Sequence, residues 1–222
     1  MICDSSQEHT KKSEHDAPSA MPQFSKEEKK HYMDLPSNVY PIFANAIRSS
    51  KSQSSEEHLK ECSELFSKFS KVASLNPKAW FPKFRTPEEI EEVSDSNRLV
   101  GFPYTKYLNS VIRVNMASSL VVMSEKLTKE LKIPQNKKVY IHGSCVLNDI
   151  WNVSKRPSLN ESPAIRECGK EVLSQAGISL SEISFLDIYS CFPSAVQIAQ
   201  KELSLDSNDN RPLTVTGGLP YF

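Results

Sequence analysis

The segment Asp187-Ile-Tyr-Ser-Cys-Phe-Pro-Ser-Ala-Val-Gln197 joins two kinds of predicted secondary structure. The mostly apolar run over 184–189 predicts a short β-strand. Pro193 suits the first turn of a helix, and the apolar residues after it recur at helical spacing, which predicts a helix over 193–203. This junction places Cys191 beside the free backbone N–H groups of a helix N-terminus, as is typical of α/β proteins.

Helix and strand patterns alternate through the second half of the chain. Strands are predicted over 138–142 and 213–216, an extended segment over 108–114, and helices over 117–131 and 163–176. Gly177 follows the last of these helices at a position that favours a left-handed glycine. The pattern predicts an α/β fold with a parallel or mixed sheet layered against helices.

The first hundred residues differ from the second half in composition and predicted secondary structure. Only 6 glycines stand against 14 prolines, where average usage gives about 15 glycines, and the first glycine is Gly101. Residues 1–32 are polar and predict a flexible lead-in. Helices are predicted over 38–48, with Pro41 in the first turn, and over 55–74. A third, short helix is predicted from Pro87 to about Val93, with Thr86 as its N-cap. This half of the chain is expected to be a helical lid or insertion.

Composition excludes several function classes. With 27 Lys+Arg against 27 Asp+Glu, the chain is not expected to bind nucleic acid. No apolar run is long enough to cross a membrane, and Met1 to Lys30 lacks the apolar core of a secretory signal. The five cysteines are an odd number at wide spacing without a CxxC pair, which argues against a disulfide framework and a metal site. We expect a soluble, intracellular protein.

Three places could carry chemistry. Cys191 could be a nucleophile whose pKa is lowered at the helix N-terminus, or a small buried packing residue, and the residues alone favour packing. His142 and Cys145 lie in His-Gly-Ser-Cys at a predicted strand end, where a hydrogen-bonding histidine is the simpler interpretation. Gly217-Gly218 would let the backbone approach a ligand closely, and a plain tight turn explains them equally well.

Several phrases, taken in order, resemble thiolases, in particular the thiolase-like protein type 1 group often labelled acetyl-CoA acetyltransferase-like. The likeness begins at Tyr40-Pro-Ile-Phe-Ala-Asn-Ala-Ile-Arg48 and covers about residues 33–222. It is strongest in Asp149-Ile-Trp-Asn-Val-Ser154, Ser162-Pro-Ala-Ile-Arg166 and Asp187 to Gln197, and it ends in Thr214-Val-Thr-Gly-Gly-Leu-Pro-Tyr-Phe222. So many phrases in one order make a chance match improbable.

The resemblance implies a layered thiolase fold of two similar halves. Residues 33–106 would be the loop domain that covers coenzyme A (CoA) in thiolases, and 107–222 would be part of the α/β core. The nucleophilic cysteine would precede Met1 and the catalytic histidine loop would follow Phe222. The chain is therefore expected to be incomplete and inactive by itself, and the full-length form could be a homodimer.

The resemblance also implies an acyl-CoA acyltransferase with CoA or acyl-CoA as substrate and no covalently bound cofactor. Tyr189 aligns with the Asn or His of the oxyanion hole, and a phenol can still donate a hydrogen bond there. Ser190 replaces an acidic residue, and Cys191 matches a small structural position. Tyr189 and Cys191 are the candidate catalytic residues. The candidate CoA contacts are Tyr104, Lys106, His142, Gly217 and Gly218.

Two alternatives to the acyltransferase stay open. The first is a non-catalytic CoA-binding or interaction protein on a thiolase scaffold, which the tyrosine at 189 favours. The second is a cysteine-dependent hydrolase or redox protein that uses Cys191 with His142.

Overall fold

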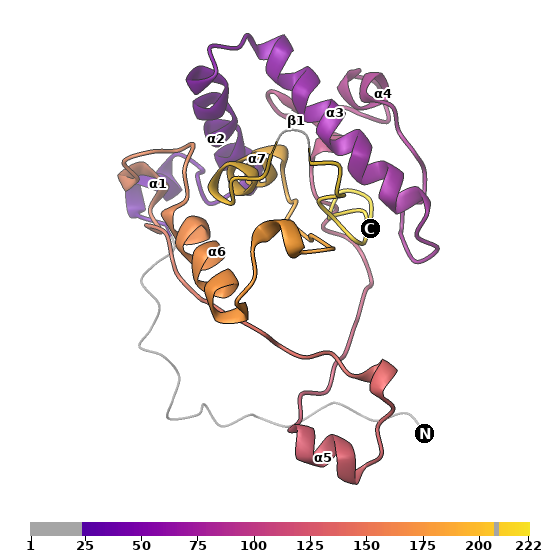
Figure 1. The fold of residues 1–222 in the computed structure, drawn as a ribbon. Coiled ribbons are helices and arrows are strands. Elements are labelled where there is room, and N and C mark those ends of the chain that lie inside the picture. The colour runs from indigo at the N-terminus through magenta and orange to yellow at the C-terminus, as the bar shows by residue number, and fades with distance from the viewer. Residues whose placement is uncertain (1–23, 207–208) are drawn as a thin grey trace, which may run out of the picture.

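The computed structural model describes residues 24–206 and 209–222 (Figure 1). Within these residues the α-helices are α1 (Lys26–Lys30), α2 (Pro36–Ser50), α3 (Ser55–Ser74), α4 (Pro87–Glu91), α5 (Glu125–Glu130), α6 (Pro163–Ala176) and α7 (Pro193–Glu202). Short 3₁₀ turns lie at Lys106–Leu108, Gln135–Lys137, Val153–Lys155 and Leu180–Glu182. No described helix has the length and apolar character needed to cross a bilayer. Most of the predicted lead-in lies outside the described residues, and its end forms α1.

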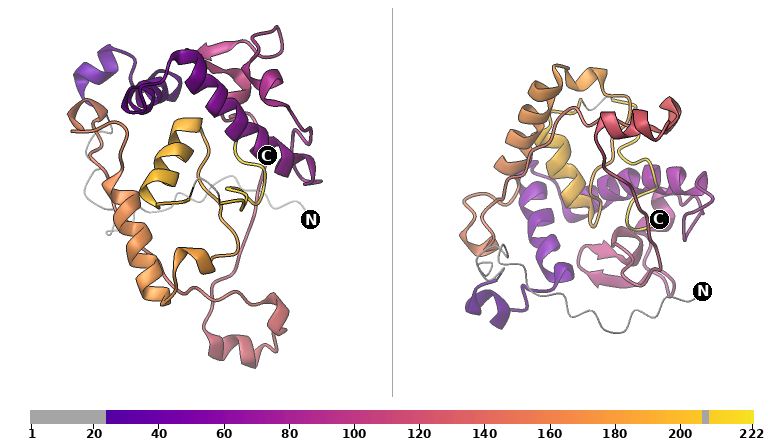
Figure 2. Two further views of the ribbon diagram at one scale, coloured as in Figure 1. Left: turned by 45° about the horizontal axis from the view of Figure 1, so that its top comes forward. Right: turned by 90° about the horizontal axis from the view of Figure 1, so that it is seen from below.

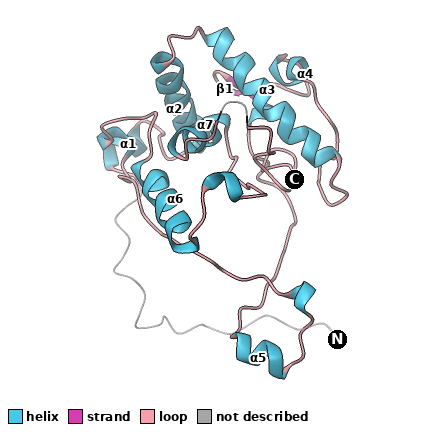
Figure 3. Ribbon diagram, in the orientation of Figure 1, coloured by secondary structure: helices cyan, strands magenta, loops and turns pink. Residues whose placement is uncertain are grey.

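Helix α3 forms where its sequence predicts. The Ser54 side chain accepts from Glu57 N, and the Glu57 carboxylate accepts from Ser54 N, which completes a capping box. One face of the helix is buried along Cys62, Phe66 and Phe69. Figure 3 shows α3 as the longest helix in the upper part of the molecule, with α4 beside it. A capping box at Thr86 starts α4, also as predicted.

Helix α2 begins earlier than the sequence predicts. Pro36 occupies its first turn, so that Pro41 lies inside the helix rather than at its start. Because proline has no N–H, the Ser37 carbonyl lacks its usual helical partner. The backbone of Gly101 lies so near this carbonyl that a side chain there would collide with it. The interior proline therefore opens space for a close contact between α2 and the chain at Gly101.

The only sheet among the described residues has two short antiparallel strands, β1 (Leu99–Gly101) and β2 (Tyr104–Thr105). Leu99 pairs with Thr105, and Gly101 pairs with Tyr104. The turn between them contains a cis Phe102–Pro103 peptide bond. The hairpin presents Tyr104 to the core, where it is fully buried.

The predicted α/β layering is only partly present within the described residues, whose one sheet is this two-stranded hairpin. The segments predicted as strands at 108–114, 138–142, 184–189 and 213–216 are not assigned as strands. A strand is stabilised by a neighbour that completes its hydrogen-bond ladder, and only isolated backbone bonds join these segments to neighbours within the described residues. One bond, from Ile188 N to the Leu213 carbonyl at 2.9 Å, links the last two.

The predicted helix over 117–131 is also shorter than expected. Only Glu125–Glu130 is helical, and Ser124 caps it by accepting from Leu127 N. The preceding residues include Val121 and Val122, whose branched side chains lower helix propensity. Figure 2 shows α5 at the end of an excursion away from the other helices, and Val139 on the same excursion is 93% exposed.

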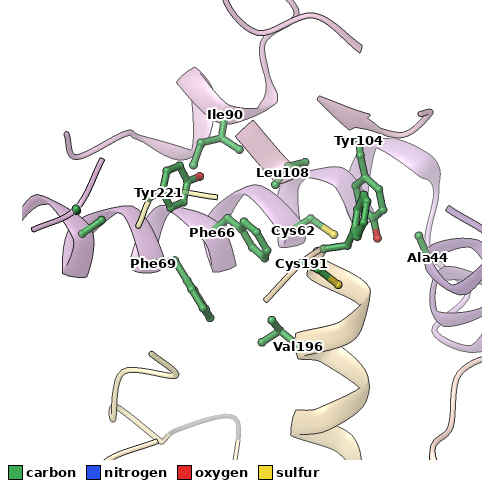
Figure 4. Close-up of a cluster of buried hydrophobic side chains, with 13 residues drawn as sticks. Ala44, Cys62, Phe66, Phe69, Ile90, Tyr104, Leu108, Cys191, Val196 and Tyr221 are labelled. Carbon is green, nitrogen blue, oxygen red and sulfur yellow. The ribbon is translucent and has the colours of Figure 1, made fainter. Parts of the chain in front are cut away.

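The core lies where α3, α7 and the C-terminal residues meet. Figure 4 shows this cluster, in which Cys62 and Phe66 of α3 lie close to Cys191 and Val196 near the start of α7. Tyr221 packs into the same cluster and donates from its hydroxyl to the Tyr107 carbonyl at 3.0 Å. Burial of such side chains contributes about 1.5–3 kcal/mol each. The core thus fixes the N-terminus of α7, where the candidate site begins.

Candidate functional site

Cys191 lies directly before Phe192, the N-cap residue of α7, as the sequence predicts. Its side chain is only 4% exposed. Burial raises the pKa of the Cys191 thiol, although hydrogen bonds with the Tyr40 and Tyr189 side chains and nearby backbone N–H groups partly oppose this shift. The thiol is therefore protonated at neutral pH, which makes Cys191 a weak nucleophile in this environment.

Two further aromatic rings enclose this end of α7. The Tyr40 ring, from α2, stacks on Phe192 with centroids 4.3 Å apart. The Tyr104 ring, from β2, lies 5.7 Å from Phe192 at a tilt of 38°. Burial raises the pKa of the Tyr40 phenol, and the neighbouring Cys191 raises it further. Tyr40 is a site residue that the sequence reasoning missed, and its place in the first thiolase-like phrase is the signal that could have found it.

Tyr189 is 67% exposed and lies directly before the buried segment that starts at Ser190. Partial burial and the adjacent Cys191 raise the pKa of its phenol. The hydroxyl is therefore a neutral hydrogen-bond donor at physiological pH. Tyr40 and Tyr189 thus approach the Cys191 thiol from two different segments.

A cavity of about 640 Å³ adjoins this group. Tyr40 and Tyr189 both line it, together with residues of α2, α6 and α7. Its walls are mainly apolar, and they include Met33, Val39, Phe43, Val153, Ile165, Ala195, Ile198 and Leu203. A mostly apolar cavity of this volume with a few polar groups has the character of a small-molecule site.

Polar residues gather on one wall of the cavity. Asp149 accepts from the Ser162 hydroxyl at 2.6 Å and from Ala164 N at 3.1 Å, which caps α6. Arg156 lies 4.0 Å from Asp149 and 5.6 Å from the centre of the Phe43 ring. Of the described lining residues, Arg156 alone carries a positive charge. The phrases at 149–154 and 162–166, where the thiolase likeness is strong, therefore build one wall.

Glu28 anchors this wall from α1. Its carboxylate accepts from Ser154 N at 2.9 Å, from the Ser154 hydroxyl at 2.8 Å and from Asn152 Nδ2 at 3.0 Å. Burial alone would raise the pKa of Glu28, but these hydrogen bonds and one from Ser25 N hold it at about 2. The carboxylate therefore stays ionised and fixes the loop before the cavity.

The other predicted site residues divide into two groups. Tyr104, Gly217 and Gly218 are buried near the same core as Cys191, and the Ser190 hydroxyl accepts from Leu219 N at 3.0 Å. Gly217 and Gly218 have φ of 117° and 75° and pack against α3 at Ala73 and Phe69, so their backbone approaches a helix. Lys106 and His142 are exposed, and no described contact brings either to Cys191. A Cys191–His142 pair is therefore not assembled within the described residues.

A metal centre is likewise not assembled in the described part of the chain. No group of three or more His, Cys, Asp or Glu side chains lies there at spacing that could hold an ion.

Solved structures of known proteins resemble this fold. No protein-family model and no curated protein matches the chain. Among solved structures, an Ltp2-ChsH2(DUF35) aldolase superposes with a TM-score of 0.56 at 17% identity, over 81% of this chain and 49% of that one, and shows the fold alone.

A second solved structure is similar to this chain in sequence as well as in fold. It is a monomeric SCP2-thiolase like protein type 1 from Mycobacterium smegmatis, with a TM-score of 0.81 and 31% identity over 91% of this chain. The predicted resemblance to the thiolase superfamily, and within it to the thiolase-like protein type 1 group, is thereby confirmed. The chain spans 44% of the length of that structure.

Proposed function

We propose that this chain forms the acyl-binding part of a thiolase-superfamily acyltransferase that acts on acyl-CoA. The observation that carries the proposal is that the apolar cavity meets the two phenols beside Cys191. The apolar cavity of about 640 Å³ reaches Tyr40 and Tyr189, and both phenols lower the otherwise raised pKa of the neighbouring Cys191 thiol. An acyl chain would lie against α2 and α7, and its thioester carbonyl would face the exposed end of Tyr189.

Tyr189 would act as the hydrogen-bond donor to the thioester oxygen. Charge develops on this oxygen in acyl transfer, and a positioned neutral donor stabilises it. Cys191 would position the Tyr189 phenol rather than attack the substrate, because its own thiol is held protonated by burial. Lys106 and His142 are exposed and stay in the proposal as contacts for the CoA phosphates. Tyr104, Gly217 and Gly218 would support the shape of the site from the core.

Calorimetric titration with CoA, acetyl-CoA and octanoyl-CoA tests this proposal. We expect octanoyl-CoA to bind at least about tenfold more tightly than CoA, since each buried methylene contributes about 0.8 kcal/mol. Ala195→Phe fills the cavity and should abolish this difference. The matched control is Leu205→Phe, in a separate cavity of about 370 Å³ between α3 and the region after α7, and it should leave binding unchanged. Equal affinity for CoA and octanoyl-CoA would overturn the acyl-binding role.

The second candidate function is a non-catalytic CoA-binding protein on a thiolase scaffold. The buried, protonated Cys191 favours it, as does the separation of His142 from that thiol. Acetyl transfer from acetyl-CoA separates the two candidates, because a binding protein shows affinity without turnover. The assay should be run on this chain and on any longer product that contains it.

The oligomeric state is part of the same proposal. The similar structure from M. smegmatis is described as monomeric. This favours a monomer over the homodimer that the resemblance implies. Light scattering after size-exclusion chromatography would decide between the two.

A further inference from the structure

The segment 143–145 runs along one face of α6. A side chain at Gly143 would come within 2.6 Å of the Val172 carbonyl oxygen, so the backbone lies directly on the helix there. The backbone of the next residue, Ser144, forms two hydrogen bonds with the Gln175 side chain, one as donor and one as acceptor. Ser144 N donates to Gln175 Oε1 at 2.9 Å, and Gln175 Nε2 donates to the Ser144 carbonyl at 3.2 Å.

This arrangement brings two thiols to the same face of α6. Cys168 shares a face of α6 with Val172 and Gln175, because the three residues are spaced at i, i+4 and i+7. Cys145 follows Ser144, which is bonded to Gln175, and precedes Asp149, which accepts from Ala164 N, so the chain at Cys145 passes along α6 beside Cys168. The neighbouring Cys168 thiol raises the pKa of Cys145. Both cysteines are free and partly exposed, whereas Cys62 and Cys191 are buried. Among the described cysteines, this pair is the one open to a reagent in solvent.

We propose that Cys145 and Cys168 are a reversible modification site that takes oxidants of the peroxide or disulfide class and closes into an intramolecular disulfide. With hydrogen peroxide, one thiol loses its proton and the thiolate attacks an oxygen. The O–O bond breaks, a sulfenic acid forms, and the hydroxide that leaves takes up the proton to give one water. The second thiol then attacks the sulfenic sulfur, the S–S bond forms, and a second water leaves. The two sulfurs lose two electrons to the peroxide, and a small thiol reverses the step by exchange.

The disulfide would act on the wall of the cavity. The loop that it closes, 145–168, contains Asp149 and Arg156, which line the cavity, and Ser162, which Asp149 holds at the start of α6. Cross-linking restricts the unfolded chain and pins the segment before Asp149 to the helix that Asp149 caps. Oxidation is therefore expected to make residues 143–149 more resistant to opening. This inference does not depend on the proposed binding of acyl-CoA.

Mass spectrometry of the whole chain after brief treatment with hydrogen peroxide tests the proposal. The protein should lose about 2 Da, the mass of two hydrogen atoms. A tryptic digest without reductant should contain peptide 139–155 joined to peptide 167–170. Dithiothreitol should restore both peptides. Hydrogen exchange of 143–149 should be slower in the oxidised protein.

Three variants make the result decisive. Cys145→Ser and Cys168→Ser should each abolish the linked peptides, and Cys3→Ser should leave them unchanged. Circular dichroism checks that each variant is folded. The proposal is overturned if the folded protein accumulates sulfenic acid without the 145–168 link. A disulfide that instead joins Cys3, Cys62 or Cys191, or that joins two molecules, also overturns it.

Discussion

The Tyr40 ring of α2 stacks on the Phe192 ring at the N-terminus of α7, with centroids 4.3 Å apart and planes 14° apart. This stack joins α2 to the segment before α7 that contains Cys191. The Tyr40 side chain also lines the cavity, and the neighbouring Cys191 helps to raise the pKa of its phenol. One side chain therefore couples packing between two regions to the geometry of the candidate site.

Tyr40→Ala should destabilise the chain by about 3 kcal/mol, because it removes a large ring from a stacked pair and leaves a void. Tyr40→Phe keeps the ring and should cost less than about 1 kcal/mol. Urea unfolding followed by circular dichroism measures both values. Equal losses in the two variants would show that the hydroxyl, rather than the stack, holds α2 to α7.

The bounds of α3 and α6 could be predicted from the sequence because local signals set them. A capping box and one apolar stripe define α3, and Ser162 with Pro163 and Gly177 delimit α6. These signals act within a few residues and need no distant partner. The start of α2 was missed because Pro36 and Pro41 can each occupy a first turn, and only tertiary contact with Gly101 distinguishes them.

The strands and half of the site could not be predicted in the same way. The pattern at 138–142 indicates a strand, but a strand requires a neighbour, and the described residues supply none. The junction at 187–197 pointed to Tyr189 and Cys191 from sequence alone. Tyr40 joins them only through folding, since α2 must cross α7 before the two side chains meet.

Gly217→Ala should destabilise the chain far more than Gly177→Ala. Both glycines have positive φ, 117° and 68°, so alanine is strained at each position. At Gly217 the added carbon would also come within 2.6 Å of Ala73 Cα in α3, whereas nothing lies within 4 Å of one at Gly177. We expect about 1 kcal/mol for Gly177→Ala and about 3 kcal/mol or more for Gly217→Ala. Similar losses in urea unfolding would contradict the close packing of Gly217 on α3.

Glu28 should make the protein sensitive to acid. Its pKa lies at about 2 in the folded chain, below the ordinary value of 4.5. The stabilisation is therefore complete above about pH 4.5 and is lost as the pH falls toward 2. Glu28→Gln should lower the free energy of unfolding by about 1–3 kcal/mol at pH 7 and by much less at pH 2.

The control for this effect is Glu27→Gln, which removes an exposed carboxylate next to Glu28 in sequence. It should shift stability little at either pH. Unfolding of the parent and both variants at a series of pH values provides the measurement. A loss for Glu28→Gln that is the same at pH 7 and pH 2 would mean that shape, not charge, fixes the Asn152–Ser154 loop.

The segments 112–123 and 139–142 should be the least protected part of the described chain. Backbone N–H groups of 112–123 and 139–142 donate to no described backbone partner, and Ile112 is 90% exposed. We expect their amides to exchange with deuterium at least about 100-fold faster than those in the middle of α3, where each N–H is bonded within the helix. Mass spectrometry of peptic peptides resolves these regions in one experiment. Protection of 139–142 equal to that of α3 would show that a strand ladder forms there in solution, as the sequence predicts.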